Sequence, residues 1–534
     1  MQNLLVQRSH LLACSIVAVL LFFPTFTKAQ PRIGWEFSFG GARQDEAFSI
    51  QQTRDGGYIT AGYTGGADEA YIPGYHGGVE DAYVVKLDPF GAMEWQTCLG
   101  GTQQEEVNSI IQTSDGGYCA AIRTESDDGE VLGYHGGLSD AWIVKLDAAG
   151  NILWSKAVGG SNFDDPLSII QTSDGGYAFA GYTMSNDGDV SQNYGGEDAW
   201  VVKLGPKGDI EWSRTFGGSS RDRARSIVQM PDGGYTMVGL TMSRDHDLET
   251  RMGGGPMDGW IVRLDHAGNI EWQKTYGGDS TDYFSSLALA PDGGFIVAGT
   301  SYSDWSSVHN HGGSDGWIVK LDSTGDIQWQ RSLGSPGNDV AWSVIPTTDN
   351  GYAIAGVAGS NGGDVFGFHG GAGDAWIVKL AANGNIVWQQ CFGGSQDDHA
   401  YQVIQSRDGN FAFAGMASSR NGDIKKAYGS VDYWVVKVSL NSSVGTASSP
   451  SLSLQAGPVS AGILSARYEL PFTSEATLEI TNLLGIRIQY VTLGEEAGGS
   501  HSASLNVGEL PAGVYYVILR ASGRTEIAPF QVLQ

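Results

Sequence analysis

Acidic residues recur at fixed places along this chain, and they are the first candidates for chemistry. When seven similar segments of the chain are aligned, one column of the alignment is acidic in all seven and follows a glycine-containing stretch: Asp45, Glu105, Asp164, Asp222, Asp282, Asp339 and Asp398. A second column begins "DAWIVKLD" (residues 140–147) and its six relatives. Neighbouring carboxylates can serve as acid and base. Sevenfold repetition, however, is typical of turns and strand ends that need a hydrogen bond in every copy. We therefore favour a structural role for both columns.

Calcium and other metals are the next chemistry to consider. The loops "SNDGDV" (residues 185–190) and "SDDGEV" (residues 126–131) resemble calcium loops in composition but lack the full ligand pattern, so calcium stays an alternative to having no cofactor. Metal ligands must converge, and the histidines of the "HGG" segments belong to separate repeats, which favours loop packing. No nucleophile, metalloprotease or phosphate-loop motif is present in the sequence, so we assign no catalytic residue and no metal site. The four histidines are His76, His135, His311 and His369.

Asymmetry between the repeats gives the best candidates for ligand binding. At the positions just after the first acidic column, most repeats have short or acidic side chains, but some repeats have an aromatic or a basic one. Aromatic rings with Arg and His can bind a sugar or a peptide by stacking and hydrogen bonding. Drift of repeat positions without function is the alternative. The candidate residues are Phe48, Arg223, Arg225, Tyr283, Trp342, His399 and Tyr401.

The elements that must position these residues come from a repeat. Near-copies of "DGGYITAGYT" (residues 55–64) recur seven times at spacings of 57 to 60 residues. Each unit has four segments of strand length, rich in aromatic and β-branched residues and separated by Gly, Asp and Asn. Four strands per unit of this length predict an all-β fold, a seven-bladed β-propeller.

The count of segments predicts how the ring closes. The first three segments occur seven times, but the Trp-containing fourth segment follows only six of them, and the missing copy stands at the front as "GWEFSFGG" (residues 34–41). We expect this N-terminal strand to complete the last blade, because closure leaves no long unpaired sheet edge. The loops after the second strands are long, and loops carry function on rigid scaffolds. We therefore expect the ligand on the long-loop face.

Two sequence motifs in the repeat and after it resemble those of known families. "LDPFGAMEW" (residues 87–95) and "LDSTGDIQW" (residues 321–329) resemble the tryptophan-docking motif of quinoprotein propellers, which implies that the Trp packs between blades. After the Ser-rich stretch 441–454 the period stops. "ARYELPFTSEATLEITNLLGIRIQYV" (residues 466–491) and "LPAGVYYVILRASG" (residues 510–523) resemble the type A C-terminal sorting domain of the type IX secretion system. This resemblance implies a small β-sandwich over residues 455–534 and recognition by that machinery.

Composition and the N-terminus indicate the compartment. The formal charge of −28 repels nucleic acid and anionic membrane surfaces. Residues 1–29 have the features of a signal peptide, with cleavage between Ala29 and Gln30. No later segment is apolar enough to span a membrane, so we expect no membrane insertion. The three cysteines of the mature chain do not form a disulfide framework and are expected to be buried free thiols: Cys98, Cys119 and Cys391.

The sequence therefore predicts an exported chain made of a signal peptide (1–29), a monomeric seven-bladed propeller (30–440), a linker (441–454) and a sorting domain (455–534). The leading functional hypothesis is a cell-surface or secreted binding or adhesion module for a glycan or protein ligand. One alternative is a polysaccharide lyase or hydrolase acting at the channel mouth, which for a glycosidase needs two carboxylates roughly 5–10 Å apart. A passive structural surface protein is the other alternative.

Overall fold

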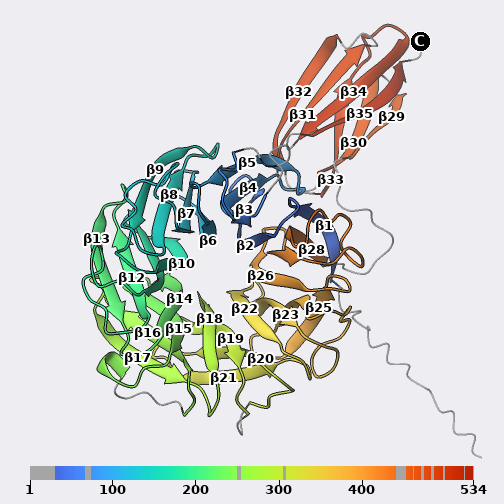
Figure 1. Ribbon diagram of the computed structural model, residues 1–534. Coiled ribbons are helices and arrows are strands. Elements are labelled where there is room, and N and C mark those ends of the chain that lie inside the picture. Colours follow the sequence, from blue (N-terminus) through green and yellow to red (C-terminus); the bar gives the residue numbers. More distant parts are fainter. Residues whose placement is uncertain are drawn as a thin grey trace, which may run out of the picture.

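The computed structural model describes residues 31–66, 72, 74–248, 254–304, 308–440, 453–460, 462–470, 474–482, 486–496, 499–521 and 524–532. The expected signal peptide, its cleavage site at Ala29 and Gln30, and most of the Ser-rich linker lie outside this range. Strands up to residue 440 form seven four-stranded antiparallel sheets, arranged as a ring around a central opening (Figure 1). The predicted all-β propeller fold is confirmed.

The first strand of each repeat lies nearest the centre of the ring (Figure 1). In six of these strands the first and third residues are buried, whereas the second and fourth are mostly half-buried; the strand that begins at Val340 starts one position later and has the same alternation shifted by one. This alternation is expected of a strand with one face on the core and the other on the channel. The inner strands are β2 (Asp45–Gln52), β6 (Glu105–Gln112), β10 (Asp164–Gln171), β14 (Asp222–Gln229), β18 (Asp282–Leu289), β22 (Val340–Pro346) and β26 (Asp398–Gln405).

The two middle strands of each blade are buried along nearly their whole length, because neighbouring blades cover both faces of the sheet. The second strands are β3 (Tyr58–Thr64), β7 (Tyr118–Thr124), β11 (Tyr177–Thr183), β15 (Tyr235–Thr241), β19 (Phe295–Ser301), β23 (Tyr352–Ala358) and β27 (Phe411–Ala417). The third strands are β4 (Asp81–Leu87), β8 (Asp140–Leu146), β12 (Asp198–Leu204), β16 (Asp258–Leu264), β20 (Asp315–Leu321), β24 (Asp374–Leu380) and β28 (Asp432–Leu440). A 3-10 turn, η1 (His246–Leu248), follows β15.

The outer strands include the predicted closing strand. β1 (Pro31–Phe39) pairs antiparallel with β28, so residues from both ends of the repeat region share one sheet. The prediction that the N-terminal strand completes the last blade is confirmed. The other outer strands are β5 (Met93–Leu99), β9 (Ile152–Val158), β13 (Ile210–Phe216), β17 (Ile270–Tyr276), β21 (Ile327–Leu333) and β25 (Ile386–Phe392).

The outer-strand tryptophans join neighbouring blades. Trp95 of the first blade packs edge-on against Tyr118 of the second, with ring centroids 5.7 Å apart. The same ring also lies under the turn at Gly150, where an added Cβ would come within 2.9 Å of it, so glycine is needed there. The packing role implied by the tryptophan-docking resemblance is thus observed. The equivalent pairs are Trp35–Tyr58, Trp154–Tyr177, Trp212–Tyr235, Trp272–Phe295, Trp329–Tyr352 and Trp388–Phe411.

A buried cation meets the aspartate of the turn between the first two strands in every blade, a turn that is Asp-Gly-Gly in the first five blades. In the second blade the Lys145 ammonium lies 2.9 Å from the Asp115 carboxylate, while Asp115 also accepts the Gly117 N–H at 3.0 Å. Six blades use Lys and the fourth uses Arg263. These Lys–Asp pairs anchor the short-loop face. The other Lys pairs are Lys86–Asp55, Lys203–Asp174, Lys320–Asp292, Lys379–Asp349 and Lys437–Asp408.

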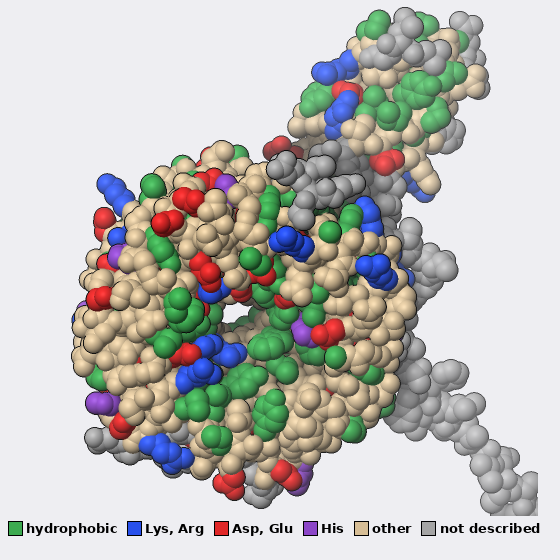
Figure 2. Space-filling view, in the orientation of Figure 1, with side chains coloured by type: hydrophobic (Ala, Val, Ile, Leu, Met, Phe, Trp, Pro, Cys, Tyr) green, Lys and Arg blue, Asp and Glu red, His purple; other side chains and the backbone are tan. Residues whose placement is uncertain are grey.

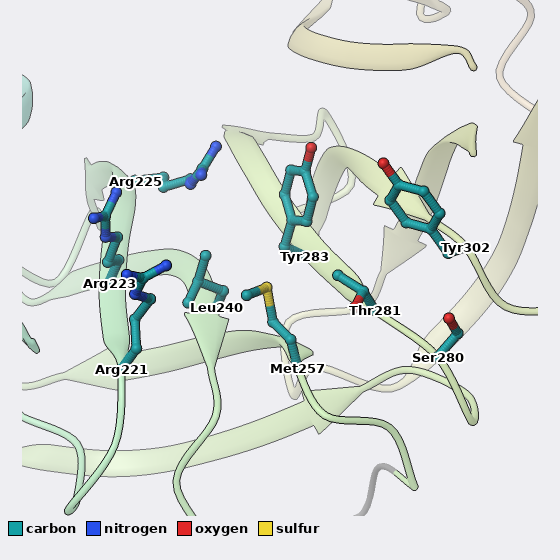
Figure 3. A pocket seen from close by; sticks show the side chains of 9 residues that line it. All are labelled: Arg221, Arg223, Arg225, Leu240, Met257, Ser280, Thr281, Tyr283 and Tyr302. Atoms are coloured by element: carbon teal, nitrogen blue, oxygen red, sulfur yellow. The ribbon is translucent and has the colours of Figure 1, made fainter. Parts of the chain in front are cut away.

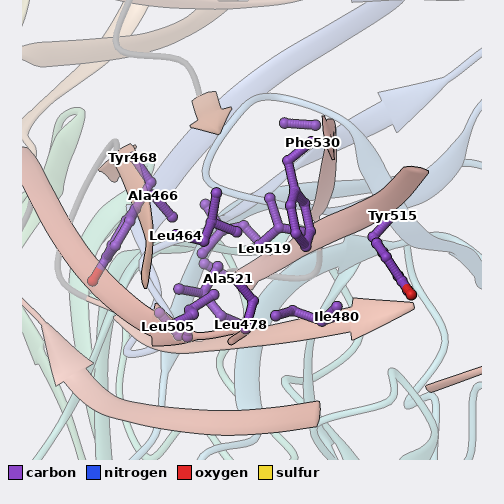
Figure 4. Packing of buried hydrophobic residues seen from close by; sticks show 14 of the residues in the cluster. Leu464, Ala466, Tyr468, Leu478, Ile480, Leu505, Tyr515, Leu519, Ala521 and Phe530 are labelled. Carbon is purple, nitrogen blue, oxygen red and sulfur yellow. The ribbon is translucent and has the colours of Figure 1, made fainter. Parts of the chain in front are cut away.

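The C-terminal region forms two further sheets, of three and four strands. Alternate residues such as Leu464 and Ala466 are buried, and with Leu478, Leu519 and Phe530 they form one apolar core (Figure 4). Two sheets over a shared core match the expected β-sandwich. The first sheet is β29 (Ser453–Ser460), β30 (Ile463–Leu470) and β33 (Gly499–Asn506), and the second is β32 (Arg487–Glu496), β31 (Ser474–Asn482), β34 (Gly513–Ala521) and β35 (Arg524–Val532).

Candidate functional site

Each inner strand has a β-bulge three residues after the repeated acidic residue that precedes or begins it. In β2 the pairing with β3 shifts between Ala47 and Ser49, which leaves Phe48 without a partner. The opposite residue is Gly62, where an added Cβ would lie 1.9 Å from the Glu46 carbonyl oxygen. Bulges re-aim a side chain and are frequent beside functional sites. The bulged residues are Phe48, Asn108, Leu167, Arg225, Ser285, Trp342 and Tyr401.

Two positions per blade therefore line the channel: the residue just after the repeated acidic residue, and the bulged residue two positions later. All seven predicted ligand-binding residues fall on these positions, at the long-loop end. The contacts between them divide the seven into an aromatic group and a basic group. Figure 2 shows the opening, with Lys and Arg side chains on its lower-left rim, acidic side chains above it and hydrophobic ones to its right.

The aromatic group comes from the first, sixth and seventh blades. Tyr401 has its ring centroid 5.1 Å from that of Phe48 and 6.3 Å from that of Trp342. The His399 Nδ1 atom lies 3.2 Å from the Tyr401 hydroxyl, which donates to Glu46 at 2.7 Å. Burial, followed by the Glu46 charge, raises the pKa of Tyr401 well above its usual value. Tyr401 is therefore a neutral donor that holds this group together.

The basic group lies beside a pocket of about 390 Å³ between the fourth and fifth blades (Figure 3). Arg223 and Arg225 project from β14, and Tyr283 projects from β18 on the other side. The loop after β19 adds Tyr302, which is 46% exposed. All of these lie at the long-loop end of their strands. The lining residues are Arg221, Arg223, Arg225, Leu240, Met257, Ser280, Thr281, Tyr283 and Tyr302.

The three arginines of this pocket differ in whether a carboxylate lies beside their positive charge. Glu197 lies 3.1 Å from the Arg221 Nε and 2.5 Å from the Arg223 Nε, so one carboxylate serves both. Although burial alone lowers the pKa of Arg223, the Glu197 hydrogen bond and charge raise it. Arg225 stacks over the Tyr283 ring with its Cζ 4.9 Å from the centroid. Its Nε is buried and has no hydrogen-bond partner among the described residues. Burial lowers the pKa of Arg225.

An acidic wall faces the channel from the first three blades, and its residues are not among the seven predicted ones. Its members occupy the second inner-strand position: Glu46, Glu106 and Asp165. Burial raises the pKa of Glu106 to about 7; Arg123 opposes the shift, and Glu80, Asp165 and Glu46 add to it. The sequence does carry a signal for this wall, because the three acids stand at the same position of three successive repeats; they form the acidic series that the aromatic and basic residues interrupt.

The repeated acidic residues have the structural contacts that were predicted for them. Asp164 accepts the Gly160 N–H at 2.7 Å and the Ser185 hydroxyl at 2.7 Å, which ties the loop before the inner strand to the end of the second strand. Burial raises the pKa of Asp164 to about 6, although these hydrogen bonds oppose the shift. The third-strand Asp140 accepts the backbone N–H of His135 at 2.7 Å.

The "HGG" histidines connect loops of neighbouring blades. His135 has its Nδ1 2.9 Å from Asp140 of its own blade and its Nε2 3.4 Å from Asp189 of the next blade. His76 and His311 make the same two-sided contact, and His369 makes the contact within its blade. This is the loop-packing role that was predicted. Within the described ranges, no group of three His, Cys, Asp or Glu residues could hold a metal ion.

The loops that resemble calcium sites use their acids for backbone contacts. Asp128 accepts the Thr102 N–H at 2.7 Å and the Thr102 hydroxyl at 2.8 Å. Asp187 accepts the Ser161 N–H at 2.8 Å. Both contacts connect the loop after the second strand to the loop before the inner strand. Cys98, Cys119 and Cys391 are buried free thiols, as expected.

Comparison with known proteins gives limited similarity. No protein-family model matches the chain. The regulatory protein FlaEY of Caulobacter vibrioides is 28% identical over 135 residues, which are 24% of this chain and 14% of that protein. PorZ, a surface component of the type-IX secretion system of Porphyromonas gingivalis, has a TM-score of 0.39 at 11% identity. The alignment covers 93% of this chain and 60% of PorZ. Puromycin hydrolase has a TM-score of 0.42 at 15% identity, and the alignment covers 82% of this chain and 61% of the hydrolase.

The chain thus spans a small part of FlaEY and about three fifths of each of these two solved structures. The fold assignment rests on the sheets themselves. No helix within the described residues is both long and apolar enough to cross a bilayer.

Proposed function

We propose that this chain is an exported, cell-surface or secreted binding protein whose propeller binds a glycan or protein ligand at the long-loop mouth of its channel. One observation carries this proposal. The residues that build the blades repeat almost unchanged, whereas the two channel-facing positions differ from blade to blade. Their variety produces an acidic wall, a basic pocket and an aromatic group around one opening.

The route to the surface is part of the same proposal. The N-terminal signal sequence takes the chain through the inner membrane, and residues 455–534 serve as the sorting domain for the type IX machinery. Two features support this: the "ELP", "ATLEITNLLGIRI" and "LPAGVYYVIL" motifs and the two-sheet core of this region. The machinery is thus the proposed export partner, and the propeller is the cargo.

The binding proposal is tested with the purified full chain on glycan and protein arrays. Two variants, one inside the channel and one outside it, test whether the ligand binds at the channel mouth. Ser285→Trp puts a large ring at the bulged position of the fifth blade, the position that Trp342 occupies in the sixth blade. Arg214→Gln changes an exposed outer-strand residue that is outside the channel. We expect a hit whose affinity falls at least about tenfold in Ser285→Trp.

Affinity should stay unchanged in Arg214→Gln. A ligand bound equally well by Ser285→Trp would place the site elsewhere. No hit on either array would leave the passive structural role as the better description.

A second candidate function, a polysaccharide lyase or hydrolase, is favoured by Glu106. Its pKa of about 7 is that of a carboxyl group able to donate and accept a proton near neutral pH. Incubating each glycan hit with the full chain and separating the products tests this. Products formed by the wild type but not by Glu106→Gln would support the enzyme, and binding without turnover would support the binding module.

A further inference from the structure

We propose that the pocket between the fourth and fifth blades binds a sugar unit with a single carboxylate, and that Arg225 is the group that recognises this carboxylate. This inference rests on the proposed binding function and deepens it. It names the class of ligand, an acidic glycan, and the residue that selects it.

The first step is the charge of Arg225. Within the described part of the chain, it has no carboxylate partner, and its buried Nε has no hydrogen-bond acceptor. The side chain is half-buried, and leaving its buried N–H without an acceptor is unfavourable, so a bound anion that supplies the missing acceptor is stabilised. The pKa of Arg225 is lowered by burial, consistent with a missing counter-charge.

The second step is the contrast with the other two arginines. Arg221 and Arg223 share Glu197, and Arg223 also stacks over Tyr182 with its Cζ 3.9 Å from the ring centroid. Their hydrogen-bonding capacity is partly used by the protein. The guanidinium of Arg225 stands at the edge of the pocket opposite Tyr302 (Figure 3). Its planar fork matches the two oxygens of one carboxylate.

The third step is the number of negative charges that the ligand carries. Arg225 supplies one positive charge without a carboxylate partner, and Arg221 and Arg223, which share the single charge of Glu197, leave one more. The rest of the channel carries the acidic wall of Glu46, Glu106 and Asp165, and the chain as a whole has a formal charge of −28. A densely charged polyanion would be repelled by this field. A sugar chain with one acidic unit, at an end or between neutral sugars, fits the charges better.

The fourth step is the shape and lining of the pocket. Its volume of about 390 Å³ is within the range of small-ligand sites. Tyr283 and Tyr302 offer two rings on which the apolar face of a sugar ring can stack. The hydroxyls of Ser280 and Thr281 lie on the same side as these rings and can hydrogen-bond sugar hydroxyls. This mixture favours a sugar acid over an acidic peptide.

The experiment compares acidic sugars with their neutral counterparts. Disaccharides that end in one uronic acid, such as cellobiouronic acid, are titrated calorimetrically into the full chain beside the matched neutral sugar, here cellobiose. A panel covers the glucuronic, galacturonic and mannuronic forms. We expect at least one acidic member to bind about tenfold or more tightly than its neutral counterpart. Arg225→Met should abolish this preference, and Arg225→Lys should reduce it.

Folding of the variants is controlled independently. Because Arg225→Met removes a half-buried charge whose buried N–H has no acceptor, its melting temperature should equal or exceed that of the wild type. Arg214→Gln, which removes an exposed arginine of the outer strand β13, should leave the preference intact. Equal binding of acidic and neutral sugars, or an acid preference that survives in Arg225→Met, would overturn the inference while leaving the binding function in place. Binding of an acidic peptide in place of every uronic sugar would overturn the assignment to a glycan.

Discussion

Trp35 and Tyr58 join the two ends of the propeller. Their rings meet edge-on with centroids 5.4 Å apart, and the contact connects the closing strand β1 of the last blade to the second strand of the first blade. Six further aromatic pairs connect the other blades in the same way. The pair at Trp35 is distinctive because it involves a strand whose removal would leave β28 as an open sheet edge.

Trp35→Ala should lower the free energy of unfolding of the propeller by about 3 kcal/mol, because it removes a large aromatic contact between two blades. Deleting residues 31–41 should cause a much larger, cooperative loss. All fifteen tryptophans of the chain lie between residues 35 and 434, so tryptophan fluorescence in urea reports the propeller without the C-terminal domain. Leu153→Ala, at a 59% exposed position, is the control. A deletion that leaves the transition unmoved would refute the latch.

In the Lys–Asp pairs, we expect replacing the exposed aspartate to destabilise the fold more than replacing the buried lysine. Lys145 is buried, whereas the side chain of Asp115 is 57% exposed. Asp115→Asn keeps the turn acceptor but leaves a buried ammonium without its counter-charge, and we expect a loss of about 2 kcal/mol. Lys145→Met leaves a carboxylate that water can solvate, and we expect a loss below about 1 kcal/mol. Urea unfolding of both variants measures the order, and the reverse order would contradict this account.

The carboxylates predict a stability maximum in mildly acidic solution. Burial raises the pKa of Asp45 and Asp81 to about 6 and that of Asp198 to about 7, so the folded state binds more protons than the unfolded state below these values. Stability should therefore increase as the pH falls from 8 towards 5. Asp115 and Asp174 behave in the opposite way: burial alone would raise their pKa, but hydrogen bonds from Thr and Lys side chains and from Gly amides lower it to about 2.

Below pH 4 the unfolded state takes up protons at these two groups first, and stability should fall again. The melting temperature measured by tryptophan fluorescence between pH 3 and pH 8 should thus have its maximum near pH 5. A maximum above pH 7 would show that these buried carboxylates do not govern the stability.

Glu106 gives a single-residue version of the same test. With its pKa at about 7 against an ordinary value of 4.5, its charge is unfavourable in the folded state at pH 8. Glu106→Gln should therefore raise the melting temperature at pH 8 by about 2 °C and leave it nearly unchanged below pH 5. Gln104→Glu, which adds a charge beside Glu80, a carboxylate that contributes to the raised pKa of Glu106, should do the opposite at pH 8. Equal shifts at both pH values would mean that packing, rather than charge, controls this position.

The architecture was predictable because each blade repeats its strands, its turn and its interblade Trp, and because the missing Trp strand stood at the N-terminus. The Lys–Asp pairs were not predicted, although Lys86 and Asp55 both belong to repeated segments. Pairing them requires knowing that the end of the third strand lies beside the turn between the first two.

The candidate site was predicted in part. The seven residues do lie on channel-facing positions, but the reason, a bulge after Ala47 and its equivalents, depends on strand register, which one sequence does not reveal. The glycine that the bulge requires, Gly62, belongs to the repeated phrase, but only the register shows that its close neighbour is the carbonyl of Glu46 within the same blade. The division into an aromatic and a basic group, and the acidic wall of Glu106, needed the order of the blades around the channel.

The bulge also bears on how such a protein changes over evolutionary time. Since the bulged residue pairs with nothing, a substitution there leaves the ladder of backbone hydrogen bonds untouched. In this chain the same position already holds Phe48, Asn108, Leu167 and Arg225 without altering the blade. New specificities can therefore arise by single replacements, one blade at a time, without the loss of stability that usually accompanies a new binding surface.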